Sequence, residues 1–370
     1  MTAGALAELT RIADDRLAPA RAWSAAGRGP VIGVIGPDVP RELVTALGGL
    51  AVRLHGRPGT DRDLGDRYLG RGVDTWARAL LAALLQNTWA GLDALIVGRD
   101  CEASSRLFFA LRELHRIGAA ADLPPVLLCD VLHLPHRSTT RYVATRLAQL
   151  QAQLEERTGR RTPDGALSAA VTAHDRVRAR LRRLADLRRA PGPRLSGSDA
   201  LAVHAAVQAL APEDAEPLLA ALTADLAGRE PLTGVRVHLT GSAHDEPAVY
   251  RQLEAGGAVI ISEDHDWGDL QWRRPVGDAT GLAERYQHNG PSAQRACAQA
   301  RAALLEEDLT AGRPELVVAY VREQDDAPAW DLPAQREVAS RHDVPLVLLE
   351  HQRYGQVDPN PLDAVRRRYR

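Results

Sequence analysis

Short runs of apolar, β-branched residues alternate with longer helical stretches along most of this chain, and this alternation limits the folds open to it. Four such runs occur before residue 140 and four more after residue 230. Strand-like runs that alternate with helices at this spacing are typical of βαβ units and parallel sheets. The sequence therefore predicts an α/β protein with two similar parallel-sheet domains joined by a helical region.

The two sets of runs correspond in order and pattern, although their residues differ. The first half reads VIGVIGP, LAVRLHG, LDALIVGRDC and PPVLLCDVLH, and the second reads VRVHLTGS, GAVIISE, PELVVAYVREQDD and VPLVLLEHQR. We expect four segments along the chain: an N-terminal helical extension (1–29), a first α/β domain (30–140), a helical region (141–230) and a second α/β domain (231–370).

Periodic apolar residues predict a long helix in the middle segment. They step by three or four positions and so share one helix face: Leu167, Val171, His174, Val177, Leu181, Leu184 and Leu187. Arginines occupy many of the other positions between 176 and 189. Because no aromatic residues interleave with them, we interpret these arginines as a solvated face and not as a nucleic-acid patch.

Every one of the 46 basic residues is an arginine, so the chain contains no lysine. This excludes enzymes that form a Schiff base through lysine and standard P-loop nucleotidases, since both need a primary amine. With 48 acidic residues the formal charge is −2, which argues against nucleic acid or an anionic membrane as a partner. Any anionic ligand has to be held by arginine or by backbone N–H groups.

Nothing in the sequence points to a membrane or to export. No apolar run reaches the roughly 18 residues that a membrane-spanning helix needs, and the N-terminal stretch reads as an amphipathic helix, unlike a signal peptide. The three cysteines, Cys101, Cys129 and Cys297, are too few and too scattered for a disulfide framework. We expect a soluble, cytoplasmic protein.

Ligands of parallel α/β sheets gather beyond the carboxyl ends of the strands. Cys101 and Asp325 follow corresponding strands in the two halves. We therefore expect these two residues to face each other across a cleft between the domains.

Four longer segments are specific enough in combination to compare with known families. They read LPPVLLCDVLHLPH, LEERTGRRTPDGALSAAVTAHDRVRARLRRLADLRRAPGPRLSGSDAL, VHLTGSAHDEPAVYRQLEAGGAVIISEDHDWG and VPLVLLEHQ. Together they resemble the 2-hydroxyacyl-CoA dehydratase and benzoyl-CoA reductase family, from about residue 30 to the end. The resemblance implies flavodoxin-like domains with a helical part.

Members of that family act as two-subunit assemblies that bind an acyl-CoA thioester. A four-iron four-sulfur cluster, held by three cysteines, passes single electrons to the substrate, and an ATP-dependent activator protein delivers those electrons. For this chain the resemblance implies a small-molecule acyl-CoA or carboxylate ligand. It also implies a subunit partner, either a second copy in a homodimer or a cysteine-complete family member in a heterodimer.

The resemblance locates the three cluster positions one by one. The position after the third strand of the first half keeps its cysteine, Cys101, in LIVGRDCEAS. The position before an aromatic-Ala-Arg segment is Asp74 in VDTWARALLAALL, or Thr75 if the alignment slips by one residue. The position after the third strand of the second half is Asp325 in YVREQDDAPAWD, or its neighbour on either side.

One cysteine and two carboxylates hold an iron–sulfur cluster poorly, because the cluster iron prefers soft thiolates. Cys129, inside an apolar strand, and Cys297, in a helical stretch, do not occupy the family positions. We therefore expect no four-iron four-sulfur cluster in this subunit. A single divalent ion with Cys101 among its ligands is one alternative. An ordinary role for Asp74 and Asp325, as polar loop residues or helix N-caps, is the other.

Cys101, Asp74 and Asp325 are thus the candidate catalytic residues. Cys101 is a candidate nucleophile if Arg99 or a following helix N-terminus lowers the pKa of its thiol. The sequence places no histidine or other general base beside it.

The candidates for substrate binding are polar residues near strand ends, each of which also has an ordinary structural interpretation. Arginines can hold a phosphate or carboxylate, the backbone of a turn can cradle an anion, and histidine–aspartate groups can transfer protons or bind metal. The substrate-binding candidates are Arg78, Arg99 and Arg322; Thr240, Gly241 and Ser242; and Asp264 and His265. Asp266, His133 and His136 are further members of histidine–aspartate groups that could transfer protons or bind metal.

Three functions fit these observations. The first is a dehydratase- or reductase-like subunit that contributes the fold, the interface and part of an acyl-CoA pocket, without a cluster of its own. The second is a repurposed, cluster-free enzyme that acts on an acyl thioester or small carboxylate through Cys101 and the strand-end acids. The third is a non-catalytic binding or scaffold protein. The first two predict an open cleft between the domains, and the third predicts that side chains fill it.

Overall fold

A computed structural model describes residues 4–120 and 122–357 of the chain. Within them lie two four-stranded parallel sheets, with strand orders β2-β1-β3-β4 and β6-β5-β7-β8. The strands are β1 (Val31–Ile35), β2 (Leu50–Arg53), β3 (Ala94–Gly98), β4 (Val126–Cys129), β5 (Val235–Gly241), β6 (Ala258–Glu263), β7 (Leu316–Arg322) and β8 (Leu346–Gln352). The predicted fold class, two similar parallel-sheet α/β domains, is confirmed.

The two sheets share one topology because the chain repeats one pattern of strands and crossovers. In each sheet the first strand lies between the second and the third, which is the beginning of the flavodoxin-like strand order. Every pairing is parallel, with Val31 opposite Leu50 in the first sheet and Val237 opposite Leu316 in the second. The central strands β1, β3 and β7 are buried along their whole length because helices cover both faces of a doubly wound sheet.

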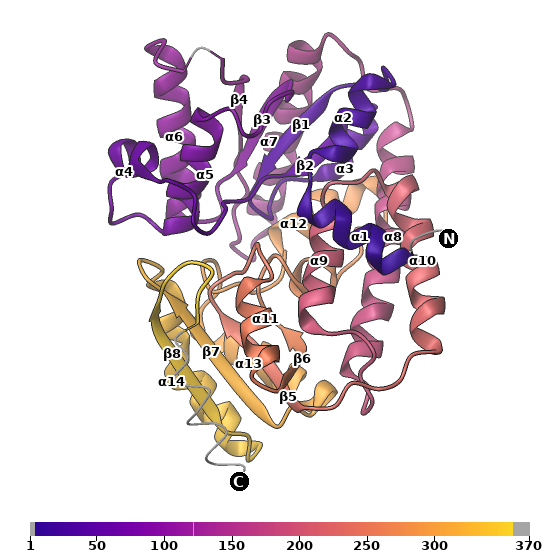
Figure 1. The fold of residues 1–370 in the computed structure, drawn as a ribbon. Coiled ribbons are helices and arrows are strands. Elements are labelled where there is room, and N and C mark those ends of the chain that lie inside the picture. Colours follow the sequence, from indigo (N-terminus) through magenta and orange to yellow (C-terminus); the bar gives the residue numbers. More distant parts are fainter. Residues whose placement is uncertain (1–3, 121, 358–370) are drawn as a thin grey trace.

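The helices fill the crossovers and the segment between the domains. Their bounds are α1 (Ala5–Asp14), α2 (Ala18–Ala25), α3 (Arg41–Ala46), α4 (Asp63–Leu69), α5 (Thr75–Leu85), α6 (Glu102–Arg116), α7 (Arg137–Thr158), α8 (Ala166–Arg189), α9 (Gly197–Val207), α10 (Pro212–Ala227), α11 (Ala248–Ala255), α12 (Leu282–Gln287), α13 (Ala298–Gly312) and α14 (Ala327–Arg341), with short 3-10 turns η1 (Asp269–Trp272) and η2 (Ala279–Gly281). Figure 1 shows the first sheet in the upper half, the second sheet in the lower half, and α8–α10 beside both.

The apolar stripe predicted for the middle segment lies on α8, where its central residues Val171, Val177, Leu181 and Leu184 are buried. The interpretation of the arginines between 176 and 189 as a solvated face is wrong in part, because Arg178 and Arg188 are buried on this helix. Carboxylates from distant parts of the chain neutralise them, so burial does not leave a bare charge.

Arg178 joins the helical region to the first domain. Its guanidinium contacts the fully buried carboxylate of Glu42 on α3 and also donates to Asp175, one turn earlier on α8. The hydroxyl of Tyr286 on α12 donates to the other oxygen of Glu42 at 2.9 Å. Three separate segments therefore depend on one buried carboxylate.

Among the described residues, no helix is both long enough and apolar enough to cross a membrane.

Replacing Glu42 with glutamine is expected to lower the free energy of unfolding by about 3 kcal/mol, because Arg178 loses the buried carboxylate that balances it. The matched control is Glu113→Gln, which removes an exposed pair with Arg116 on α6 and is expected to cost less than about 1 kcal/mol. Urea unfolding of both variants measures the difference. Equal losses in the two variants would contradict the role given to Glu42.

Candidate functional site

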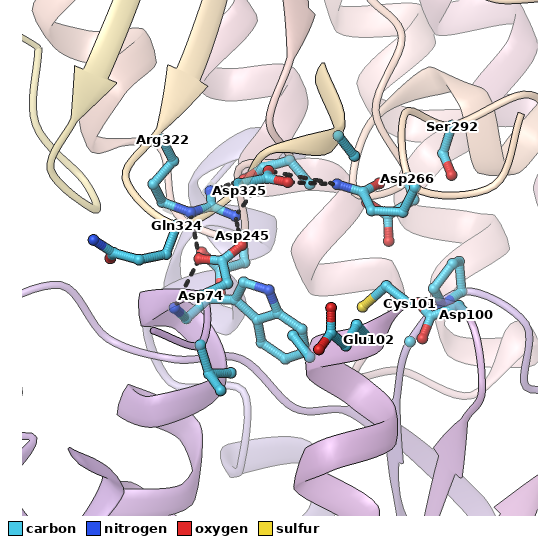
Figure 2. A pocket seen from close by; sticks show the side chains of 18 of the residues that line it. Asp74, Asp100, Cys101, Glu102, Asp245, Asp266, Ser292, Arg322, Gln324 and Asp325 are labelled. Carbon is cyan, nitrogen blue, oxygen red and sulfur yellow. Dashed lines mark hydrogen bonds and ion pairs between the residues drawn. The ribbon is translucent and has the colours of Figure 1, made fainter. Parts of the chain in front are cut away.

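A cavity of about 320 Å³ lies between the two α/β domains. Residues after β1 and β3 form one side of it, and residues after β5 and at the end of β7 form the other. Figure 2 shows Asp74, Asp100 and Cys101 on the first-domain side and Arg322, Asp325 and Asp266 on the second. The expectation that Cys101 and Asp325 face a common cleft between the domains is confirmed, since both line this cavity.

The position of the cavity follows from the topology of the sheets. In each sheet the chain leaves the first strand in one direction and returns to its other side with the third strand, so the strand order reverses between them. Ligands of such sheets bind beyond the carboxyl ends of the strands at this reversal. Gly36 follows β1 and Asp100 follows β3, while Ala243 follows β5 and Asp325 follows β7. The two switch points therefore open into the same cavity.

Asp74 and Arg322 form a buried ion pair across the cavity. Arg322 Nε donates to Asp74 Oδ1 at 2.8 Å, and Arg322 Nη2 donates to Asp74 Oδ2 at 2.7 Å. The third nitrogen, Nη1, donates to the backbone carbonyl of Ala243 at 2.7 Å. Asp74 also caps α5, where its Oδ1 accepts the amide N–H of Trp76. Arg322 is thus directed to Asp74 and to the backbone, and not to a free anion in the cavity.

Asp325 is buried beside this pair but has weaker partners. Its Oδ2 lies 3.6 Å from Arg322 Nη2, and the amide nitrogen of Gln294 lies 3.5 Å from each of its oxygens. Burial, together with the charge of Asp74, raises the pKa of Asp325 to about 6. This carboxyl group therefore exchanges its proton near neutral pH.

Asp100 is a second carboxyl group of this kind, and the sequence reasoning did not select it. Its Oδ1 is buried and has no hydrogen-bond partner among the described residues. Burial and the charge of Asp38 raise the pKa of Asp100 to about 7. Its position directly before Cys101 at the end of β3 was the available signal.

Cys101 caps the N-terminus of α6. Its Sγ lies 3.4 Å from the amide nitrogen of Ser104 and 3.3 Å from the hydroxyl of Ser104. Burial and the charge of Asp100 raise the pKa of the thiol well above its usual value. The suggestion that Arg99 lowers this pKa is wrong, since the side chain of Arg99 is exposed and pairs with Asp130. Cys101 is a neutral thiol in this cavity.

The other candidates for substrate binding lie outside the lining of the cavity. Arg78 is buried against Val73 O, Asp66 and Thr75. The hydroxyl of Ser242 accepts a hydrogen bond from the backbone N–H of Arg322, and so helps to fix the position of the arginine backbone. Gly241 lies so close to the backbone of β7 that a Cβ would be 2.1 Å from Tyr320 O.

A buried network explains Thr240 and Asp264. The hydroxyl of Thr240 donates to Asp264, and the fully buried Arg301 contacts both of them and Asp331 on α14. His265 lies behind the cavity, where its Nε2 is 2.6 Å from the hydroxyl of Tyr250. These contacts hold the carboxyl ends of β5 and β6 together.

The two histidines after the fourth strand also have structural partners. His133 Nε2 lies 2.7 Å from Asp38 Oδ2, and its Nδ1 lies 2.9 Å from Gln287 O. His136 is the residue before α7, and its carbonyl accepts from Thr140 and Gln287. Neither residue lines the cavity.

Several charged and aromatic residues of the cavity wall were not among the candidates chosen from the sequence. They are Arg53, Trp76, Asp100, Glu102, Arg106, Asp245 and Trp267. Asp266, which was named only as part of a histidine–aspartate group, contacts the guanidinium of Arg53. Their clustering depends on the relative placement of two domains, which a local pattern does not contain.

One further group in the described residues has the spacing of metal ligands, outside this cavity. Atoms of His204, Glu263 and Asp269 lie within 4.8 Å of one another, and all three residues are buried. Arg188 Nη2 contacts Glu263 at 2.6 Å and Asp269 at 2.9 Å, and Arg189 also contacts Asp269. The two carboxylates are already neutralised by arginine, so this group is an ion-pair network.

Asp74 and Asp325 are expected to respond in opposite ways to replacement by asparagine. Asp74→Asn should lower the free energy of unfolding by about 3–5 kcal/mol, because it leaves the buried guanidinium of Arg322 without its bidentate partner. Asp325→Asn should raise the free energy of unfolding at pH 8, because the folded protein holds the ionised Asp325 carboxylate unfavourably.

The gain in stability expected for Asp325→Asn should depend on pH in a defined direction. The folded-state pKa of Asp325, about 6, exceeds its ordinary value of 3.8. Stability is therefore lost as the pH rises from about 4 to about 6, by at most roughly 3 kcal/mol. Asp325→Asn removes this loss, so the gain over the unmodified protein should appear between pH 4 and pH 6 in urea titrations. A gain that is the same at pH 4 and pH 8 would argue against the raised pKa.

Comparison with known proteins gives the chain a family. No curated protein matches it. A family model described as "2-hydroxyglutaryl-CoA dehydratase, D-component" matches residues 38–361. This segment includes every strand except β1, and every residue that lines the cavity from Arg53 to Ala327. The chain belongs to the family of the 2-hydroxyglutaryl-CoA dehydratase D-component.

Proposed function

We propose that this chain is a 2-hydroxyacyl-CoA dehydratase-like subunit that binds the acyl end of a CoA thioester in the interdomain cavity and holds no four-iron four-sulfur cluster of its own. The observation that carries the proposal is that Asp74, Cys101 and Asp325, the residues that the resemblance assigns to the cluster positions, all line this cavity. They bring together one neutral thiol, one carboxylate bound to arginine and one buried carboxyl group.

The donor set at these positions does not fit a cluster. Cluster iron is held by thiolates, and Cys101 is the single cysteine among the residues that line the cavity. Both oxygens of Asp74 accept hydrogen bonds from Arg322, so an iron atom there would have to displace a buried guanidinium. A single divalent ion faces the same competition, and we infer that the cavity works without either.

The charge of the cavity favours an uncharged acyl group. Seven of the lining residues are acidic and three are arginines. Each arginine contacts a lining carboxylate: Arg53 contacts Asp266, Arg106 contacts Glu102, and Arg322 contacts Asp74. A second carboxylate inside this cavity would meet uncompensated negative charge at close range, which is unfavourable in a poorly solvated site. The thioester carbonyl and a hydroxyl group carry no such penalty.

The raised pKa values of Asp100 and Asp325 support a second candidate, a cluster-free enzyme that uses these acids. Carboxyl groups that titrate near neutral pH can donate a proton to a leaving hydroxyl or accept one from carbon. Both side chains line the same cavity. The open volume of about 320 Å³ argues against a purely scaffolding protein, for which side chains would fill the cleft.

Two assemblies are compatible with the family, and our first proposal requires one of them. A subunit without a cluster needs a cysteine-complete relative to supply single electrons, so we propose a heterodimer with such a relative. The cluster-free enzyme would instead act as a single species or a homodimer.

Anaerobically purified protein is expected to contain far fewer than the about four irons per chain that a thiolate-held cluster requires. Metal and acid-labile sulfide analysis, together with the visible spectrum, measures this. A full complement of iron and sulfide in the isolated chain would overturn the proposal. Co-purification with a cysteine-complete relative favours the subunit, and activity of the chain alone favours the cluster-free enzyme.

Titration calorimetry is expected to show that an acyl-CoA with an uncharged 2-hydroxyacyl group binds about tenfold more tightly than 2-hydroxyglutaryl-CoA, which adds a carboxylate. Lactoyl-CoA is a suitable uncharged probe, and free CoA controls for contacts outside the cavity. Because burial holds Asp100 and Asp325 partly protonated, the preference should grow as the pH rises from 5 to 8. Equal affinity for the two thioesters at pH 8 would argue against an acidic acyl site.

A further inference from the structure

The N-terminal helical extension lies outside the segment that matches the family model, which begins at residue 38. Its first helix, α1, nevertheless packs into the core of the molecule, and Leu9 and Ile12 are buried there. Figure 1 shows α1 lying across α9 and α10. The turn between α1 and α2 carries Arg16, which is also buried. The extension therefore places a cation inside the protein.

Arg16 contacts two residues of the cavity wall from behind. Its Nη2 donates to the backbone carbonyl of Asp245 at 2.5 Å, and its Cζ lies 5.1 Å from the centre of the Trp267 ring. Both Asp245 and Trp267 line the cavity, whereas Arg16 does not. A guanidinium at this distance from an indole is attracted to the ring.

The wall that Arg16 contacts has other supports as well, since Trp267 packs in the apolar core of the second domain and lies beside His55. Trp267 also lies beside Arg53, whose Cζ is 3.9 Å from the ring centre. The carboxylate of Asp245 accepts the hydroxyl of Tyr354 and the amide N–H of Gly56. Arg16 is the contact that links the indole to the backbone of Asp245.

Packing alone does not explain a buried arginine at this position. Nη1 of Arg16 is buried and has no hydrogen-bond partner among the described residues, and such a group costs free energy relative to an apolar side chain of similar size. Burial lowers the pKa of Arg16 to about 10, and the nearby carboxylates of Glu246 and Asp245 oppose this shift. The buried guanidinium of Arg16 is therefore held in contact with Asp245 and Trp267 of the cavity wall.

We propose that Arg16 is a positioning residue for the ligand, through which the N-terminal extension fixes the indole of Trp267 and the backbone of Asp245 in the wall of the interdomain cavity. This inference rests on the proposed function in one respect only, the identity of the ligand as an acyl-CoA thioester. The placement of the wall can be tested without any ligand.

The test uses the full-length protein with Arg16→Met, Arg16→Lys and the control Arg21→Met. Methionine keeps most of the length of the side chain without its charge, and lysine keeps the charge without the planar guanidinium. Arg21 belongs to the same extension but is exposed and pairs with Asp15. Trp267→Phe assigns the contribution of Trp267 among the 6 tryptophans.

In calorimetry with lactoyl-CoA, Arg16→Met is expected to weaken binding about tenfold, Arg16→Lys less, and Arg21→Met by less than about twofold. Without ligand, Arg16→Met should increase the quenching of Trp267 fluorescence by acrylamide, and Arg21→Met should not. Unchanged affinity in a folded Arg16→Met protein would overturn the proposal.

The quenching measurement separates this inference from the proposed function, because it needs no ligand. If the unmodified protein binds no acyl-CoA, the proposed function fails, and Trp267 quenching alone decides on Arg16. Increased quenching in Arg16→Met then upholds the positioning role, and unchanged quenching overturns it. If Arg16→Met does not fold, the same two measurements on Arg16→Lys decide.

Discussion

The bidentate ion pair between Asp74 and Arg322 is the interaction on which the candidate site depends. It joins the start of α5 in the first domain to the end of β7 in the second, and it closes one side of the cavity. A second pair, between Arg53 and Asp266, spans the same gap. Both arginines are buried, and a buried cation is tolerated only where its partner is held in good geometry. The distance between the domains is therefore set by charge as well as by apolar packing.

Because the chain contains no lysine, the cation in each of these pairs is a guanidinium group. Guanidinium groups form planar, two-point contacts with carboxylates, which ammonium groups cannot do. Arg322 contacts both oxygens of Asp74 in this way, and Arg53 and Arg106 each contact one oxygen of a lining carboxylate, so the surplus of acidic residues is left facing the open volume. The expectation that arginine would hold an anionic ligand assumed free guanidinium groups. Arg78, Arg99 and Arg322 instead hold the protein's own carboxylates.

The fold could be predicted because strand and helix patterns are local, and the two halves repeat them. The meeting of Cys101 and Asp325 could be predicted for a similar reason, since topology alone brings the ends of corresponding strands to the switch points. The burial of Arg178 and Arg188 could not. Their partners Glu42 and Glu263 lie far away in the sequence, and a local pattern cannot tell a paired arginine from a solvated one.

The cavity holds two kinds of carboxyl group, and the difference between them bears on function. Asp74 is matched by a buried cation, so its ionised form contributes to the stability of the fold. Asp100 and Asp325 have raised pKa values because burial and neighbouring acids disfavour their charge. Asparagine at either position would avoid that cost, so the acids do not serve stability.

Ionisable groups held at a cost inside a cavity are typical of sites that transfer protons. The same cavity has a surplus of acidic residues and offers a neutral thiol at Cys101 in place of a thiolate. A hydroxyl group on an uncharged acyl chain meets both conditions, because it can accept a proton from either acid and brings no charge of its own. We therefore propose, from the chemistry of the wall, that this cavity suits a hydroxyacyl thioester better than a free acid and proton transfer better than electron transfer.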